Sequence, residues 1–253
     1  MRPYVLAESN WKQIKDQQVD LVILPWGATE AHNFHLPYAT DILEADHLAA
    51  ESARLAHEAG ARVMVLPTIP FGVNTGQRDI NLDINLNPST LTAIIGDILE
   101  TLDYQGIRKL LIFNSHGGNE FKPILRELGL QYPDMFLAFT NWYTCLDKAK
   151  YFDHDGDHAD EMETSLLLHL RPDLVLPLAE AGPGKEKMIK IPSFQKGLAW
   201  TERKWPLVTD DTGIGDPRQA TAEKGARYFV DITRLMADLF IEMAEADLNN
   251  LYE

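Results

Sequence analysis

The segment GATEAHNFHLPYATD, residues 27–41, holds two carboxylates and two histidines between Glu30 and Asp41. In an extended backbone, residues two apart point to the same side, so Glu30 and His32 can face a common centre. Asp41 comes at the start of the next predicted helix, and the intervening loop can fold it back. Mixed carboxylate and imidazole ligands suit Zn²⁺, Mn²⁺ or Fe²⁺ better than Ca²⁺ or Mg²⁺. The segment therefore indicates a transition-metal site.

Two further segments carry residues of the same kind. NSHGGN, residues 114–119, brings His116 from another predicted strand. A carboxylate with a histidine, repeated and joined by a further aspartate, is suitable chemistry for two divalent cations that share a bridging carboxylate. DHDGDHADEMETS, residues 153–165, adds His158 and Glu163, which are the remaining pieces that a metal hydrolase needs.

Each of these residues also has a purely structural interpretation. Asp41 and Glu44 have the spacing of a capping box, so Asp41 can simply cap its helix. The acidic residues from Asp160 onwards fall in the first turn of a helix, where the helix dipole favours negative charge. The glycine pair after His116 could simply form a tight turn. His35 fits a packed or solvated loop histidine, and we expect it to be a bystander.

Short apolar runs alternate with longer amphipathic segments along the chain. The runs predict strands, and the segments, whose apolar positions recur every three or four residues, predict helices. Residues 178–214, rich in Pro, Gly and Lys, give no clear pattern. We expect strands at residues 21–27, 62–72, 109–119 (running into the glycine turn) and 135–143. We expect helices at residues 42–59, 88–106, 120–130 and 161–170. A last helix is expected to be capped by Asp216, to have Pro217 as its first residue and to run to about residue 246.

This order of elements predicts an α/β fold, with a mainly parallel sheet covered by helices on both faces and one domain over residues 1–253. In open parallel sheets, ligands bind beyond the carboxyl ends of the strands. Glu30 and His32 follow the first predicted strand, and His116 follows the third. We therefore expect these side chains to converge on one rim of the sheet.

The composition narrows the class of protein. A formal net charge of -15 argues against nucleic-acid binding, which needs clusters of Lys and Arg, and against an anionic membrane surface. Cys145 is the only cysteine, so an intrachain disulfide and a cysteine zinc site are excluded. The N-terminal segment becomes charged before an apolar signal core can form, and no apolar run is long enough to cross a bilayer. We expect a cytoplasmic protein with a small-molecule substrate and without nucleic-acid or membrane partners.

Three segments together resemble the creatininase (creatinine amidohydrolase) family. They are LPWGATEAHNFHLPYATD at residues 24–41, NSHGGN at 114–119 and HADEMETS at 158–165, in the family's order. The resemblance implies a three-layer α/β/α fold and assembly as a homo-oligomer such as a hexamer. It also implies a centre of two Zn- or Mn-type ions that hydrolyses C–N bonds of amides.

The resemblance further implies a role for each matching residue. Glu30 and His116 would bind one ion, and His32 would bind the other. Asp41 would bridge the two ions. His158 matches the histidine that the family uses near the substrate.

The sequence departs from the family pattern at three places. Gly118 stands where creatininase has a glutamate ligand of the second ion, and we expect Glu163 to replace it. His154 stands where creatininase has a gating tryptophan, whereas Trp142 matches the tryptophan that follows the fourth strand. The loop at residues 76–90 replaces the family's H-x-x-F-P-G-T loop, which argues against creatinine itself as the substrate.

The sequence supports a hydrolytic hypothesis in which a metal-bridging hydroxide attacks a carbonyl polarised by one of the ions. The N–H groups of Gly117 and Gly118 would stabilise the oxyanion. His158, with Asp157 or Glu163 nearby, would pass a proton to the leaving nitrogen.

Several substrates are compatible with this chemistry. A small cyclic amide or a formamide fits the family, and a lactone or a short peptide is an alternative. Trp142 and Arg78 are candidate substrate-binding residues; Arg78 could receive an anionic group, although it also fits a solvated surface arginine. A hypothesis of a different class is a non-catalytic module that binds a small molecule on the same scaffold, with the acids as caps and turns.

Overall fold

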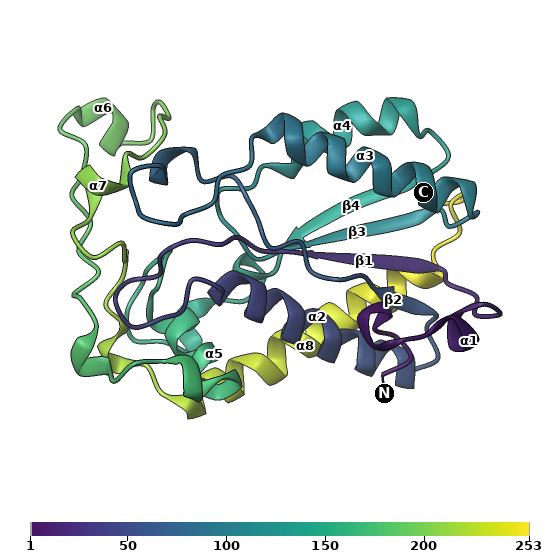
Figure 1. Cartoon of the computed structure of the whole chain (residues 1–253), viewed down its shortest axis with the longest axis horizontal. Helices are drawn as coiled ribbons and strands as arrows, with labels where there is room; N and C mark the ends of the chain where they lie inside the picture. The colour runs from purple at the N-terminus through teal and green to yellow at the C-terminus, as the bar shows by residue number, and fades with distance from the viewer. Residues whose placement is uncertain (1, 253) are drawn as a thin grey trace.

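A parallel sheet of four strands lies at the centre of the fold (Figure 1). The computed structural model describes residues 2–252. The sheet has the order β2-β1-β3-β4, and each neighbouring pair is parallel. This confirms the predicted α/β class. The strands are β1 (Leu21–Trp26), β2 (Val63–Val65), β3 (Lys109–Asn114) and β4 (Phe136–Asn141).

Helices cover both faces of the sheet and complete three layers (Figure 1). Two of them lie on one face, and three lie on the other. This arrangement confirms the three-layer α/β/α expectation. The first pair is α3 (Pro88–Tyr104) and α4 (Phe121–Gln131); the other three are α2 (Thr40–Glu58), α5 (Glu161–Leu170) and α8 (Ala222–Glu245).

The side chains of β1 divide between two apolar cores, one on each face of the sheet. Leu21 and Ile23 join the core under α2, α5 and α8. Val22, Leu24 and Trp26 join the core under α3 and α4. All six residues of β1 are buried. A parallel strand covered on both faces needs apolar residues at every position, which explains the uninterrupted run LVILPW.

Short helical turns connect the main elements, with η denoting a 3-10 helix. Within the described residues, no helix combines the length and the apolar character needed to span a membrane. The turns are η1 (Leu6–Glu8), α1 (Trp11–Ile14), η2 (Thr75–Gln77), η3 (Trp142–Thr144), η4 (Lys148–Lys150), η5 (Pro172–Leu174), η6 (Leu178–Glu180), α6 (Pro192–Gln195), α7 (Trp205–Val208) and η7 (Pro217–Gln219).

The second predicted strand, residues 62–72, is wrong in its extent. β2 ends at Val65, and beyond it only isolated bridges form, at Ile69 and at Gly72. Pro67 and Pro70 lie in this stretch. Proline has no backbone N–H to give to a ladder, so the pairing cannot continue as a regular strand.

The predicted start of the last helix is also wrong. Asp216 accepts a hydrogen bond from the Arg218 N–H and caps only η7. α8 is capped instead by Thr221, whose side chain accepts from the Lys224 N–H. An Asp-Pro pair suits the start of a turn as well as the start of a helix, so this pattern does not separate the two.

A buried lysine joins the sheet to the end of α8. Lys109 begins β3, and its ammonium group donates hydrogen bonds to the carbonyls of Ala244 (2.8 Å) and Ala246 (2.7 Å). The last carbonyls of a helix lack partners within the helix, and the helix dipole favours a cation there. Lys109 therefore caps α8 from the sheet.

Replacing Lys109 by methionine keeps the apolar stem and removes the donors. We expect the free energy of unfolding to fall by about 1–3 kcal/mol, because a charged hydrogen-bond donor to two carbonyls is lost. Urea unfolding followed by circular dichroism measures the change. Lys122→Met, at an exposed position of α4, is the matched control, and equal stability of the two variants would contradict the capping role.

Candidate metal centre

The predicted ligands meet beyond the carboxyl ends of β1 and β3. Glu30 and His32 follow β1, Asp41 lies in the first turn of α2, and His116 follows β3. All four side chains are buried. Ligand atoms form three overlapping groups, each within 4.8 Å: Glu30, Asp41 and His116; His32, Asp41 and Glu163; and Glu30, His32 and His158.

Asp41 is shared by two of these groups. Its Oδ1 lies 2.9 Å from His32 Nε2, and its Oδ2 lies 3.1 Å from His116 Nδ1. Among the described residues, Oδ2 has no hydrogen-bond partner of good geometry. Ala39 occupies the N-cap of α2 without a side-chain hydrogen bond, so the capping-box interpretation of Asp41 is wrong. Asp41 instead turns one oxygen towards each histidine.

Carboxylates and imidazoles at this centre hold each other in their charged forms. Burial disfavours the imidazolium of His32, but the charge of Asp41 outweighs it and raises the pKa of His32 to about 10. Burial likewise disfavours the Glu30 carboxylate, yet the charge of His116 and its hydrogen bond hold the pKa of Glu30 below its usual range. The Oε1 of Glu30 lies 2.9 Å from His116 Nδ1. The centre therefore stabilises positive charge.

His116 is seated by a backbone carbonyl and two glycines. Its Nε2–H donates to the Val73 carbonyl (3.0 Å), so Nδ1 is the nitrogen that faces Glu30. A Cβ at Gly72 would lie 2.7 Å from the imidazole Cδ2. A Cβ at Gly118 would lie 2.5 Å from Nε2 and 2.2 Å from the Val73 carbonyl oxygen. Position 118 therefore cannot carry a glutamate in this arrangement, which explains the departure from the creatininase pattern.

His158 presents one ring nitrogen to the centre. Its Nε2–H donates to the Ala31 carbonyl (2.9 Å), and its Nδ1 lies 3.8 Å from Glu30 Oε1. Its ring centroid lies 4.2 Å from that of His32 and 4.8 Å from that of Trp205. Burial and the neighbouring charge of His32 lower the pKa of His158. A neutral imidazole held in this way can accept a proton at Nδ1.

The acidic cluster before α5 divides into structural residues and a residue of the centre. Asp160 is the N-cap of α5, and Glu161 forms an ion pair with Lys224, so the helix-terminus interpretation fits both. Glu163 turns to the centre, where its Oε2 lies 3.9 Å from His32 Nε2. Burial raises the pKa of Glu163 to about 8.

Three other candidates make contacts with residues outside the ligand groups or are exposed. Trp142 is fully buried, and its indole N–H donates to Ser115 Oγ (3.0 Å), so it supports the turn after β3 and does not line an opening. Asp157 forms an ion pair with Arg203 (2.7 Å), and its predicted part in proton transfer stays a prediction. Arg78 is exposed just after η2.

The glycine pair and the bystander histidine lie close to the centre. Gly117 and Gly118 are exposed directly after His116. His35 is buried, and its Nε2 lies 2.9 Å from Thr164 Oγ1. It is a packed loop histidine that ties the loop after β1 to α5.

Sequence reasoning missed two buried residues beside the centre. Gln77 of η2 donates a hydrogen bond to Glu30 Oε2. Glu44 lies one turn after Asp41 on α2, and within residues 2–252 neither of its carboxyl oxygens has a hydrogen-bond partner. Burial, with the charges of Glu163 and Asp41, raises the pKa of Glu44 well above its usual range. The i,i+3 spacing of Asp41 and Glu44 was a signal for a shared face, but a capping box has the same spacing.

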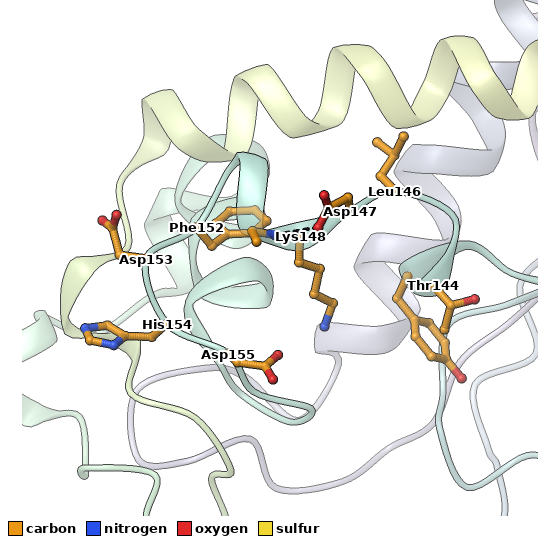
Figure 2. A pocket seen from close by; sticks show the side chains of 10 residues that line it. Thr144, Leu146, Asp147, Lys148, Phe152, Asp153, His154 and Asp155 are labelled. Carbon is orange, nitrogen blue, oxygen red and sulfur yellow. Dashed lines mark hydrogen bonds between the residues drawn. The ribbon is translucent and has the colours of Figure 1, made fainter.

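A hollow of about 570 Å³ is lined by residues between Tyr143 and Asp155, and Figure 2 shows Lys148 projecting into it. Tyr143 lines this hollow, and its pKa is raised by burial and by the charges of Asp41 and Glu163. The Nζ of Lys148 lies 3.4 Å from Asp160 Oδ2. The hollow therefore adjoins the end of α5 that carries Glu163.

Known sequences resemble this chain over most of its length. The family model for creatinine amidohydrolase, Creatininase, matches residues 7–240. The chain is 30% identical over 216 residues to the mycofactocin precursor peptide peptidase of Mycobacterium tuberculosis (strain CDC 1551 / Oshkosh), covering 82% of this chain and 79% of the relative. It is 29% identical over 195 residues to the creatinine amidohydrolase of Pseudomonas putida, covering 67% and 73%.

Solved structures share the fold. A protein of Bacteroides fragilis NCTC 9343, provisionally named a creatinine amidohydrolase, has a TM-score of 0.93 and 46% identity over 100% of both chains. A crystal structure of creatininase has a TM-score of 0.77 and 22% identity, covering 96% of this chain and 99% of the other. The chain therefore belongs to the creatininase family of metal-dependent amidohydrolases.

Proposed function

We propose that the chain is a hydrolase that uses two divalent transition-metal ions to cleave a C–N bond of a small cyclic amide or a formamide. The observation that carries this proposal is the position of Asp41, whose oxygens lie 2.9 Å from His32 and 3.1 Å from His116. The two histidines belong to different ligand groups. A carboxylate between two such groups suits a pair of ions.

The residues of the centre fit divalent cations. Asp41 Oδ2 is buried and lies 3.1 Å from His116 Nδ1, but within residues 2–252 it accepts no hydrogen bond of good geometry, and a buried carboxylate oxygen needs a partner. His116 donates from Nε2–H to the Val73 carbonyl, which turns its Nδ1 towards Glu30, and His32 Nδ1 lies 3.1 Å from the Glu30 carbonyl, which turns its Nε2 towards Asp41. Histidines that bind metals are usually oriented in this way. The mixed imidazole and carboxylate donors suit Zn²⁺, Mn²⁺ or Fe²⁺.

Each ion has a proposed set of ligands from the chain. Those of one ion are Glu30, His116 and Asp41. Those of the other are His32, Glu163 and Asp41. Glu163 groups with His32 and Asp41 within 4.8 Å, which supports it as the replacement for the glutamate of creatininase.

Bound divalent ions would lower the pKa of a water molecule and polarise the substrate carbonyl. The chain's own residues supply the remaining groups. His158, held by the Ala31 carbonyl, can take a proton at Nδ1 and return it to the leaving nitrogen. The N–H groups of Gly117 and Gly118 are the proposed oxyanion donors, because both glycines are exposed beside His116.

The burial of the side chains at the centre favours a small substrate. His116, His158 and Glu163 are each exposed by 8% or less. Similarity to the creatinine amidohydrolase of Pseudomonas putida supports a cyclic amide. Similarity to the mycofactocin precursor peptide peptidases makes a short peptide the second candidate, since a peptide bond is also an amide. A lactone and a non-catalytic binding role are the remaining alternatives, and assembly as a homo-oligomer such as a hexamer stays a prediction.

Asp41→Asn and His116→Ala test the centre as a whole. We expect the unmodified protein to hold about two transition-metal ions per chain and to hydrolyse one class among cyclic amides, formamides, lactones and short peptides. Both variants should lose metal and hydrolysis while circular dichroism shows an intact fold, because each removes a proposed ligand. Elemental analysis measures the metal, and His57→Ala, at an exposed position of α2, is the control. Full metal content in both variants would refute the site, and an unmodified protein without metal, even after reconstitution, would favour the binding module.

Glu163→Gln tests the assignment of the second ion. The change keeps the shape of the side chain and removes its charge, so we expect the variant to bind one ion fewer per chain and to lose hydrolysis. Glu127→Gln, at an exposed position of α4, is the matched control. If the Glu163 variant keeps its full metal content, another residue such as His158 completes the second site.

A further inference from the structure

Residues 185–208, which we call the arm, leave the body of the molecule and return to it. Figure 1 shows α6 and α7, which both belong to the arm, set apart from the three layers. Every residue of the arm is exposed or half-buried. Its base is fixed by hydrogen bonds from the Gly184 N–H to Asp211 Oδ2 (2.9 Å) and from the Lys187 N–H to the Val208 carbonyl (2.7 Å). The arm is therefore an anchored excursion with little apolar packing of its own.

The returning end of the arm contacts His158. The ring centroid of Trp205 lies 4.8 Å from that of His158, at an interplanar angle of 63°. This edge-to-face geometry is a favourable one for aromatic rings. The Nε2–H of His158 donates to the Ala31 carbonyl, and the centroid of the His158 ring lies 4.2 Å from that of the His32 ring. Trp205 is thus the neighbour that the arm contributes to the His158 imidazole.

Arg203 links the same end of the arm to two segments, the loop before His158 and η2. Its guanidinium forms an ion pair with Asp157 (2.7 Å), the residue before His158, and lies 5.8 Å from the ring centroid of Trp205. Its carbonyl packs on Gly76 of η2, where an added Cβ would lie 2.0 Å from the carbonyl oxygen. The arm therefore contacts the loop that carries His158 and also the turn that contacts Glu30 through Gln77.

We propose that Trp205 is a positioning residue that holds the His158 imidazole, and that the arm is the wall that limits the size of the substrate group beside it. The inference rests on the proposed function, because it concerns the substrate of the same centre. The indole is half-buried and lies against His158, so a larger amide bound on that side of the imidazole would meet it. The arm then selects for cyclic amides or formamides against peptides.

Trp205→Ala, Trp205→Phe and Trp200→Ala test this proposal in the metal-loaded full chain. Trp200 lies on the same arm and is 86% exposed, so it is the matched control. For the small amide that the unmodified enzyme hydrolyses, we expect Trp205→Ala to lower kcat/KM by about 10- to 100-fold, because His158 is no longer held. The loss should fall mainly on kcat, and Trp205→Phe should restore most of it. Activity on larger amides relative to small ones should rise in Trp205→Ala.

A second measurement does not depend on hydrolysis. Diethyl pyrocarbonate acylates accessible histidines, and mass spectrometry reads the rate at His158, with exposed His57 as the internal reference. We expect a several-fold faster reaction at His158 in Trp205→Ala, and rates equal to the unmodified protein in Trp200→Ala. Unchanged acylation of His158 in Trp205→Ala, or an equal effect of the two alanine variants, would overturn the proposal. If no protein hydrolyses any amide, the proposed function fails, while the acylation rates still decide the role of Trp205.

Discussion

The contact of one buried carboxylate with two histidines is the interaction on which the centre depends. Asp41 meets His32 and His116 at 2.9 and 3.1 Å, and these histidines follow different strands. The first turn of α2 is thereby fixed against the ends of β1 and β3. Because α2 also packs on α8 and on β1, the position of Asp41 is set by the apolar core as well as by its polar partners. A shift of α2 would change both distances at once.

The same end of the sheet concentrates buried acids that a fold alone does not require. Glu30, Asp41, Glu44 and Glu163 are all buried there, and burying like charges together is costly unless cations or protons offset them. The raised pKa values of Glu44 and Glu163 show the effect, since burial and neighbouring acids favour their neutral forms. Such a cluster is typical of a functional site, where a bound cation offsets the cost of burying the acids.

The sequence was most informative where one physical requirement decides the pattern. A strand buried on both faces must be apolar throughout, so the extent of β1 could be predicted closely. Asp41 was ambiguous because a helix cap and a metal ligand can have the same spacing, and only the orientation of its side chain separates them. Asp160 and Glu163 were ambiguous in the same way, because acidic residues at the start of a helix can serve the helix or a metal. Only the Glu163 side chain turns to the centre. Gln77 and Trp205 could not be predicted, because each meets its partner across 47 residues without a periodic pattern.

These differences separate the part of the site that carries chemistry from the part that selects a substrate. The proposed ligands stand on strand ends and first helical turns, which the sheet holds rigidly. The loop at residues 76–90 is bonded to the segment after β1, where Asp83 accepts from the Ala31 N–H. The arm contacts the start of this loop: Glu202 accepts a hydrogen bond from Thr75, and the Arg203 carbonyl packs on Gly76. An added Cβ at position 76 would clash with the Arg203 carbonyl, so the arm at Arg203 packs closely on η2. Under the proposed function, substrate choice would depend on the loop and the arm together, while the proposed ligand set depends on the sheet.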